Sequence, residues 1–260
     1  MGIIDRAWPK TDNRLLMARY TFGDDEAALK RLELVAAAYA PVSRKFVTDN
    51  APRCPKVALD LGCGPAFSTQ LLAEICAPAT LIGIDSSSRF LDIAHSRLPG
   101  AHFPVHDVAT TPLPGAPADV IYARLLLSHL PHPLDTARRW ISDLAAGGVL
   151  LIEDLEHIEA PPGPLQTYDH ISADIVKGAG GLMYAGAALS ALGGRHAAVT
   201  VPAALAARIY LFNVMRWRQD PTTPVPTDEL ARLQADLTTI MHDDNGATVS
   251  WIVRQIAVHT

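Results

Sequence analysis

Three carboxylates at the predicted ends of apolar runs are the residues of this sequence best suited to chemistry. The first, Asp60, lies in the run 57–61, directly before a turn that contains Gly62 and Gly64. A strand, a glycine turn and the start of a helix expose backbone N–H groups and typically bind a nucleotide-like ligand. Asp60 would repel a phosphate there, whereas it would attract a cationic amine or sulfonium. The pattern therefore predicts a nucleotide-like ligand that carries positive charge.

The other two carboxylates follow the next predicted strands. Asp85 comes after the apolar run 80–84, where a carboxylate can accept hydrogen bonds from both hydroxyls of a ribose. Asp107 follows a short third run near residues 101–105. Because the carboxyl ends of parallel strands meet at one edge of a sheet, we expect the three carboxylates to surround one ligand.

A dinucleotide-binding domain is the rival interpretation, since it also has glycines followed by an acidic residue about 20 positions later. Its Gly-x-Gly-x-x-Gly fingerprint requires a third glycine at position 67, which is Phe67. The rival also leaves Asp60 and Asp107 without a role, so the sequence disfavours it.

The stretch 57–69 resembles the first motif of the class I S-adenosylmethionine-dependent methyltransferases of the small-molecule type, an acidic residue followed by Gly-x-Gly-x-Gly. The resemblance covers roughly residues 55–157. It continues in the family's order at four more landmarks: Asp85, His106-Asp107-Val108, Asp119–Arg124 and Gly147–Ile152. Residues 20–23 resemble the N-terminal segment of this class more loosely. Five landmarks in the right order are a much more specific signal than any one alone.

The resemblance implies S-adenosyl-L-methionine as the cofactor, S-adenosyl-L-homocysteine as its product, and no metal. Asp107 looks like the residue that accepts from the adenine amino group, and Arg124 could pair with the donor's carboxylate or with a neighbouring helix. The expected cofactor-binding residues are Tyr20, Asp60, Gly62, Cys63, Gly64, Asp85, Ser86, Asp107, Val108 and Arg124.

One residue departs from the family motif, because Ala66 stands where the third glycine is expected. Alanine does not adopt a positive φ cheaply. If residue 66 already belongs to the helix, which we expect to start at Pro65, alanine is harmless. We therefore expect donor binding to survive.

The candidate catalytic residues are His129, Glu153 and His170. His129 lies where this family often has histidine, although a structural contact in the turn is the more ordinary role. Glu153 and Asp154 are expected to end the fifth strand and to face the acceptor. His170 lies with His157, Tyr168 and Tyr184 on or beside a predicted cap, where packing is the alternative.

The alternation of strands and helices predicts an α/β fold with helices on both faces of a Rossmann-like sheet. By the resemblance, the sheet has seven strands and is mostly parallel, and the last strand, at residues 248–258, is antiparallel between strands five and six. A helix is expected over residues 25–39, closed by Pro41. We predict an N-terminal helical segment over 1–50 that covers the cofactor site, and a methyltransferase domain over 51–260. A helical cap insertion is expected at about 160–196, where the alternation stops.

Composition limits the function classes. The chain has 260 residues, a net charge of −5 and no long basic cluster, which disfavours a nucleic-acid partner. No apolar run reaches the ~20 residues of a membrane span, and the three cysteines suit a reducing cytoplasm. The first residues do not resemble a signal peptide. A homodimer is compatible with the sequence.

The sequence therefore predicts methyl transfer to a small organic metabolite of secondary metabolism, at an O, N or C atom. Apolar residues beyond the fifth strand suggest an apolar acceptor, although a plain core would give the same pattern: Leu182, Met183, Tyr184, Phe212, Met215 and Trp217. The alternatives are a methyltransferase of a protein or RNA group, and a non-catalytic donor-binding protein or partner subunit.

Overall fold

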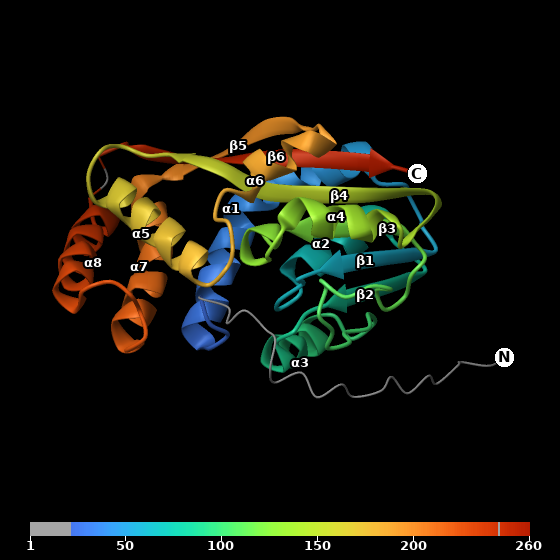
Figure 1. The fold of residues 1–260 in the computed structure, drawn as a ribbon, viewed down its shortest axis with the longest axis horizontal. Helices are drawn as coiled ribbons and strands as arrows, with labels where there is room; N and C mark the ends of the chain where they lie inside the picture. Colours follow the sequence, from blue (N-terminus) through green and yellow to red (C-terminus); the bar gives the residue numbers. More distant parts are fainter. Residues whose placement is uncertain (1–21, 244) are drawn as a thin grey trace.

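The computed structural model describes residues 22–243 and 245–260, so the expected contact of Tyr20 lies outside the described residues. Its sheet has six strands in the order β2-β1-β3-β4-β6-β5 (Figure 1). The strands are β1 (Val57–Leu61), β2 (Thr80–Ile84), β3 (Ala118–Arg124), β4 (Leu144–Glu159), β5 (Arg195–Pro202) and β6 (Thr248–His259). Strands β1 to β4 are parallel, whereas β6 is antiparallel to both of its neighbours, β4 and β5. The mostly parallel Rossmann-like sheet and the placement of the last strand are therefore confirmed.

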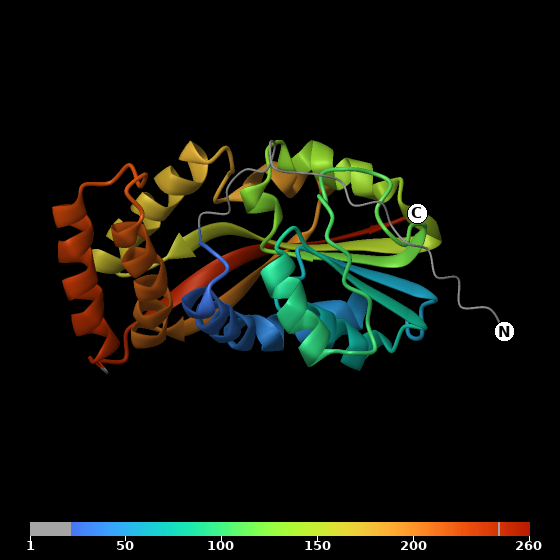
Figure 2. The ribbon, with the colours of Figure 1, turned by 90° about the horizontal axis from the view of Figure 1, so that it is seen from below.

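The helices lie on both faces of this sheet and in a separate lobe beside it. They are α1 (Glu26–Asn50), α2 (Phe67–Cys76), α3 (Ser88–Arg97), α4 (Pro133–Ile141), α5 (Pro164–Gly178), α6 (Ala185–Leu189), α7 (Ala203–Gln219) and α8 (Thr227–Met241), with 3-10 turns η1 (Leu127–His129) and η2 (Ser190–Leu192). Figure 2 shows α1 and α2 on one side of the sheet and α4 on the other. Two buried apolar clusters fill these two interfaces.

The expected count of seven strands is wrong. Residues 101–105 contribute only two isolated bridges, between Ile82 and His102 and between Asp85 and Val105. Pro104 lies between the two bridges and has no N–H to donate, so a continuous ladder cannot form along this edge. The segment nevertheless lies beside β2, and this position brings Asp107 to the same end of the sheet as Asp85.

Strand β4 is 16 residues long and continues well past the point where Glu153 and Asp154 were expected to end it. Together with β6 it extends beyond the parallel strands toward the lobe of α5, α7 and α8 (Figure 1). A third apolar cluster fills that lobe and includes residues of α5, α7, α8 and β6. The cap boundary at 160–196 remains a prediction, and α5 shares its core with two helices outside that range.

Helix α1 runs through Pro41 to Asn50, so the expectation that Pro41 closes this helix is wrong. A proline inside a helix removes one hydrogen bond, but tertiary packing can compensate. The residues after Pro41 supply that packing, because Ser43, Phe46 and Val47 are buried. Asp25 caps the helix start, where its Oδ1 accepts from the backbone N–H of Ala28 at 2.9 Å.

Ala66 adopts the left-handed conformation, with φ +67° and ψ +26°, and α2 begins one residue later. The expectation that residue 66 is already helical is therefore wrong. The left-handed region costs a residue with a Cβ about 1–2 kcal/mol. The turn after β1 thus has the backbone conformation typical of glycine at residue 66, and Ala66 is strained in it.

Replacing Ala66 by glycine should raise the free energy of unfolding by about 0.5–1 kcal/mol, because relief of the strain exceeds the added chain entropy of glycine. Ala73, in the right-handed interior of α2, provides the control. Ala73→Gly should lower the free energy of unfolding by roughly 1 kcal/mol. Urea denaturation of both variants measures the difference, and destabilisation of similar size in both would show that residue 66 is unstrained.

Candidate functional site

A cavity of about 1570 Å³ opens where the carboxyl ends of the parallel strands face the helical lobe. Cavities for one small ligand usually measure about 300–1,000 Å³, so this one has room for two molecules side by side. We call the part lined by residues 62–65, 67–68, 85–88, 104–110, 124–126 and 128–131 the sheet half. The cap half is lined by Arg31, Val35, Tyr39, Leu155, Ile158, Tyr168, Val176, Met183, Ile209, Tyr210, Asn213, Arg216 and Trp251.

The glycine turn lines the sheet half, and its two glycines have different surroundings. Both have positive φ, +63° at Gly62 and +50° at Gly64. A Cβ on Gly62 would meet Leu126 Cδ1 at 2.6 Å, whereas a Cβ on Gly64 would find only Leu32 Cδ1, at 4.0 Å. The positive φ of Gly62 and its nearness to the Leu126 side chain thus account for this glycine without a ligand. Gly64 instead leaves an open cradle against which a ligand can lie close to the backbone.

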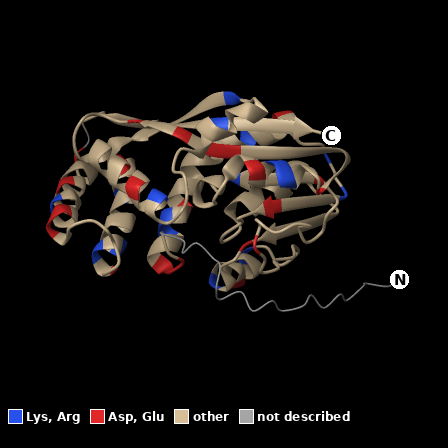
Figure 3. Ribbon diagram, in the orientation of Figure 1, with Lys and Arg blue, Asp and Glu red and all other residues tan. Residues whose placement is uncertain are grey.

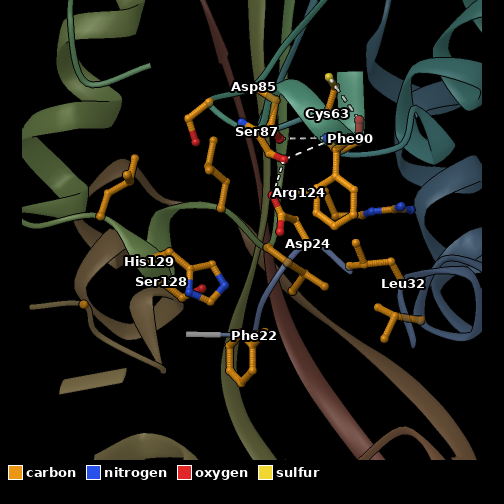
Figure 4. A pocket seen from close by; sticks show the side chains of 18 of the residues that line it. Phe22, Asp24, Leu32, Cys63, Asp85, Ser87, Phe90, Arg124, Ser128 and His129 are labelled. Atoms are coloured by element: carbon orange, nitrogen blue, oxygen red, sulfur yellow. Dashed lines mark hydrogen bonds between the residues drawn. The ribbon is translucent and has the colours of Figure 1, made fainter. Parts of the chain in front are cut away.

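Asp85 ties this turn to the second strand. Its Oδ2 accepts from the backbone N–H of Gly64 at 2.8 Å, and its Oδ1 accepts from the backbone N–H of Ser87 at 2.8 Å. Burial raises the pKa of Asp85, while the backbone N–H donors oppose this rise. Figure 4 shows the hydrogen bonds continuing from Ser87, whose hydroxyl donates to Asp24 at 2.8 Å. Each carboxylate oxygen of Asp85 keeps a further lone pair that can accept from a ligand.

Asp60 lies behind the turn and is not among the cavity-lining residues. It is fully buried, and its Oδ2 accepts from the hydroxyls of Ser68 and Thr69, each at 2.7 Å. Burial raises the pKa of Asp60 to about 6, although these two hydrogen bonds oppose the rise. Asp60 therefore braces the start of α2 against β1, and any effect on a ligand passes through the turn.

The other expected cofactor residues with described positions line the sheet half: Cys63, Ser86, Asp107, Val108 and Arg124. Arg124 Nη1 donates to Ser43 Oγ on α1 at 3.4 Å, so the contact with a neighbouring helix exists. The structure thus brings together eight of the ten residues expected from the sequence, since Gly62, Gly64 and Asp85 join these five.

The three candidate catalytic residues lie in different places. His129 lines the cavity and packs edge-on against Phe22, with 5.4 Å between ring centroids (Figure 4). Burial, together with the smaller effect of the nearby Arg31 charge, lowers the pKa of His129 to about 4. Glu153 is fully buried outside the lining, where it accepts from Tyr122 at 2.5 Å and from Gln255 at 2.8 Å. His170 is exposed on α5, also outside the lining.

Only some of the expected cap residues line the cavity. Tyr168 is buried in the cavity wall, whereas Tyr184 lies outside the lining and donates its hydroxyl to Asp169. His157 pairs at the surface with Glu159, at 3.5 Å. Of the apolar residues, Met183 lines the cavity, while Leu182 and Met215 are 43% and 47% exposed.

Asp154 stabilises the turn that carries His129. Its Oδ2 accepts from the backbone N–H groups of Leu127 at 2.8 Å and Ser128 at 3.4 Å. Burial raises the pKa of Asp154 to about 7, although backbone hydrogen bonds from Leu155, Leu127 and Ser128 oppose the rise. In the unfolded chain this carboxyl titrates near pH 4. Between about pH 4 and pH 7 the native state thus holds a proton that the unfolded state has lost, and stability falls as pH rises.

Asp154→Asn should therefore reduce the loss of stability between pH 5 and pH 8 by at least about 1 kcal/mol. The side-chain amide cannot titrate, although it sacrifices the bond from Leu155, so the pH dependence and not the absolute stability is the readout. Urea denaturation at the two pH values measures it, with the exposed Asp135→Asn as control. An unchanged pH dependence in Asp154→Asn would mean that Asp154 is ionised throughout this range.

Sequence reasoning missed most of the cap half. Its wall contains Tyr39 from α1, Tyr210 and Asn213 from α7, and Trp251 from β6. Arg31 also lines it and is only 7% exposed. One signal was present, since Arg31 lies four and eight positions before two lining residues of the same helix face, Val35 and Tyr39. A charged residue on an otherwise apolar face often marks a site.

Figure 3 shows Lys and Arg interspersed with Asp and Glu along the ribbon. Among the described residues, no helix is both long and apolar enough to cross a membrane. Within the same part of the chain, no three His, Cys, Asp or Glu side chains form a group that could hold a metal ion.

Comparison with known proteins matches residues 58–148 to a family described as a methyltransferase domain. A trans-aconitate 2-methyltransferase from Rhizobium rhizogenes is 38% identical over 104 residues, which are 40% of each chain. The corresponding protein from Methylobacterium radiotolerans is 36% identical over 144 residues, 55% of this chain and 50% of that protein. The chain thus spans half or less of the length of these two curated relatives.

Among solved structures, the YcgJ protein from Bacillus subtilis covers 84% of this chain and 97% of its own, with a TM-score of 0.55. The sequence identity is 14%, so this likeness concerns the fold alone. A sarcosine dimethylglycine methyltransferase described from Galdieria sulphuraria shares the fold at a TM-score of 0.51 and 14% identity, over 93% of this chain and 91% of that one.

Proposed function

The chain belongs, through residues 58–148, to the class I S-adenosylmethionine-dependent methyltransferases, and from this membership we propose that it methylates a small, largely apolar organic metabolite. The observation that carries the proposal is the open cradle at Gly64 beside Asp85, in a cavity too large for the donor alone. Secondary metabolism is the proposed context. The cytoplasmic location and a homodimer remain predictions from the sequence.

The sheet half is the proposed donor site, and its residues fit the parts of this cofactor. Asp85 would accept from the ribose hydroxyls, Asp107 from the adenine amino group, and Arg124 would face the carboxylate. Gly64 lets the donor lie against the backbone without a clash. When bound, the donor supplies an electrophilic methyl group on a positively charged sulfonium. The protein has to orient the acceptor, exclude water and remove a proton where the acceptor carries one.

We propose that His129 accepts a hydrogen bond from the acceptor and so helps to orient it. It lines the cavity, and its lowered pKa of about 4 keeps the imidazole neutral at physiological pH. A neutral ring nitrogen can accept a hydrogen bond, whereas a pKa this low makes it a weak base for removing a proton. We assign no contact with the acceptor to Glu153 or His170, since both lie outside the cavity lining.

A carboxylate acceptor is the second candidate. The two relatives described above are named for trans-aconitate, and the cap half contains the buried cation Arg31. A guanidinium suits a carboxylate because it can donate two parallel hydrogen bonds. The cap half is lined mainly by aromatic and aliphatic side chains, and we therefore prefer the apolar acceptor. Polar groups in the cap half also favour an enzyme over a non-catalytic donor-binding protein.

Methyl transfer itself tests this proposal. The purified protein is incubated with S-adenosylmethionine labelled in the methyl group and with small-molecule extracts, and products are identified by mass. We expect label in an apolar metabolite, whereas label in trans-aconitate would favour the carboxylate candidate. Label only in protein or RNA fractions, or none in any fraction, would contradict the proposed function.

A further inference from the structure

The cap half has a wall of stacked aromatic rings from three helices and a strand. Tyr168 stacks on Tyr210 with 3.8 Å between centroids and 8° between planes. Tyr39 stacks on Trp251 at 5.7 Å and 14°. Such a wall is rigid and flat, and it offers aromatic surface and edges to a ligand at little cost in conformational entropy.

Two hydrogen bonds hold three of these rings in place. Trp251 Nε1 donates to the hydroxyl of Tyr210 at 2.8 Å. Asn213 Nδ2 donates to the hydroxyl of Tyr168 at 2.5 Å. In this arrangement Nδ2 of Asn213 faces Tyr168 and Oδ1 faces away from it, and Asn213 is among the residues that line the cavity.

The other end of that amide is the informative atom. Asn213 is 3% exposed and lines the cavity, and its Oδ1 is buried without a hydrogen-bond partner. Leaving such an oxygen unsatisfied usually costs about 1–3 kcal/mol, so most buried polar atoms have a partner. The stability of the fold does not require this arrangement, because an apolar residue of the same shape would avoid the cost. A ligand group that donates a hydrogen bond to Oδ1 would remove this cost.

We propose that Asn213 selects the acceptor: its Oδ1 accepts a hydrogen bond from an N–H or O–H group on a flat, aromatic or conjugated molecule seated against the aromatic wall. This inference rests on the proposed function and deepens it, because it names the chemical class of the acceptor. A site with a buried hydrogen-bond acceptor rejects ligands that have no N–H or O–H group, because the acceptor atom is then left buried and unpaired. Fully ionised carboxylates only accept hydrogen bonds and do not satisfy Oδ1.

A matched pair of probes tests the proposal. 2-Naphthol and 2-methoxynaphthalene share one flat ring system, but only the first has an O–H to donate. Their dissociation constants are measured by ligand-observed NMR on the full chain, with saturating S-adenosylhomocysteine. We expect 2-naphthol to bind about tenfold more tightly, which is the effect of one hydrogen bond to a buried group. Equal affinities, or no binding of either probe while S-adenosylhomocysteine binds, would overturn the inference and leave the proposed function standing.

Variants of Asn213 assign the preference to this residue. Asn213→Leu keeps the shape and should reduce the preference for 2-naphthol to about one. Asn213→Asp keeps an accepting oxygen, and the hydroxyl of Tyr168 can reverse to donate to it, so the preference should persist. Asn213→Ala serves if the leucine variant does not fold. An unchanged preference for 2-naphthol in Asn213→Leu or Asn213→Ala would show that another group accepts the hydrogen bond from its O–H.

Two further measurements separate this inference from the proposal on which it rests. Trans-aconitate is the carboxylate probe, and its binding in place of the naphthalenes would contradict the inference in favour of an anionic acceptor. The dissociation constant of S-adenosylhomocysteine should stay within about twofold in all Asn213 variants, because Asn213 lines only the cap half. Failure of S-adenosylhomocysteine to bind the unaltered protein would reject the proposed function, and this inference with it.

Discussion

Gly64→Ala should weaken the binding of S-adenosylhomocysteine by about 100-fold while the protein stays folded. An added Cβ would meet no protein atom closer than 4.0 Å, so it would project into the cradle that we assign to the donor. A factor of 100 corresponds to roughly 2.7 kcal/mol, which is within the range for forcing a methyl group into an occupied space. Calorimetric titration of the variant measures the loss.

Gly147 provides the matched control for this change. Its φ is +76°, and an added Cβ would find no heavy atom within 4 Å. Gly147→Ala therefore carries the same conformational cost, about 1–2 kcal/mol, at the irregular start of β4, far along the chain from the cradle. Both variants should lose similar stability, and only Gly64→Ala should lose affinity. Equal affinities in the two variants would remove Gly64 from the donor site.

Asp85→Ala should weaken S-adenosylhomocysteine by tenfold or more. The change removes the proposed acceptor of the ribose hydroxyls, a loss of roughly 1.5–3 kcal/mol. It also releases the backbone N–H groups of Gly64 and Ser87, which the carboxylate holds in place. Asp85→Asn keeps one accepting oxygen, so its affinity for S-adenosylhomocysteine should lie between those of the unaltered protein and Asp85→Ala. The exposed Asp135→Ala is the control for loss of a negative charge. Unchanged affinity in a folded Asp85→Ala would mean that Asp85 only shapes the turn.

The sheet half could be predicted from the sequence because each of its parts is local. An apolar run and the carboxylate that follows it are contiguous in the chain, as in 80–85, and parallel strands bring such ends together. Local patterns failed where tertiary packing decides the outcome. Pro41 remains inside a helix because the turns after it are buried, and Ala66 is held in a left-handed conformation by the fold around it.

The cap half could not be predicted from the sequence, because tertiary packing brings its residues together. Arg31, Tyr168, Asn213 and Trp251 come from α1, α5, α7 and β6, and no spacing links them. Glu153 was misplaced because the sequence does not show where β4 ends. The strand continues to Glu159 by pairing with β6, whose residues lie about 100 positions later in the chain.

Whether the unaltered protein binds S-adenosylhomocysteine or NAD decides whether the sheet half is a site for the methyl donor. Isothermal titration of each ligand into the full chain should show one site for S-adenosylhomocysteine and no heat of binding for NAD. The prediction follows from the cradle at Gly64 together with Asp85 and Asp107 around one cavity. Binding of NAD without binding of S-adenosylhomocysteine would contradict a methyl-donor site and identify the sheet half as a dinucleotide site.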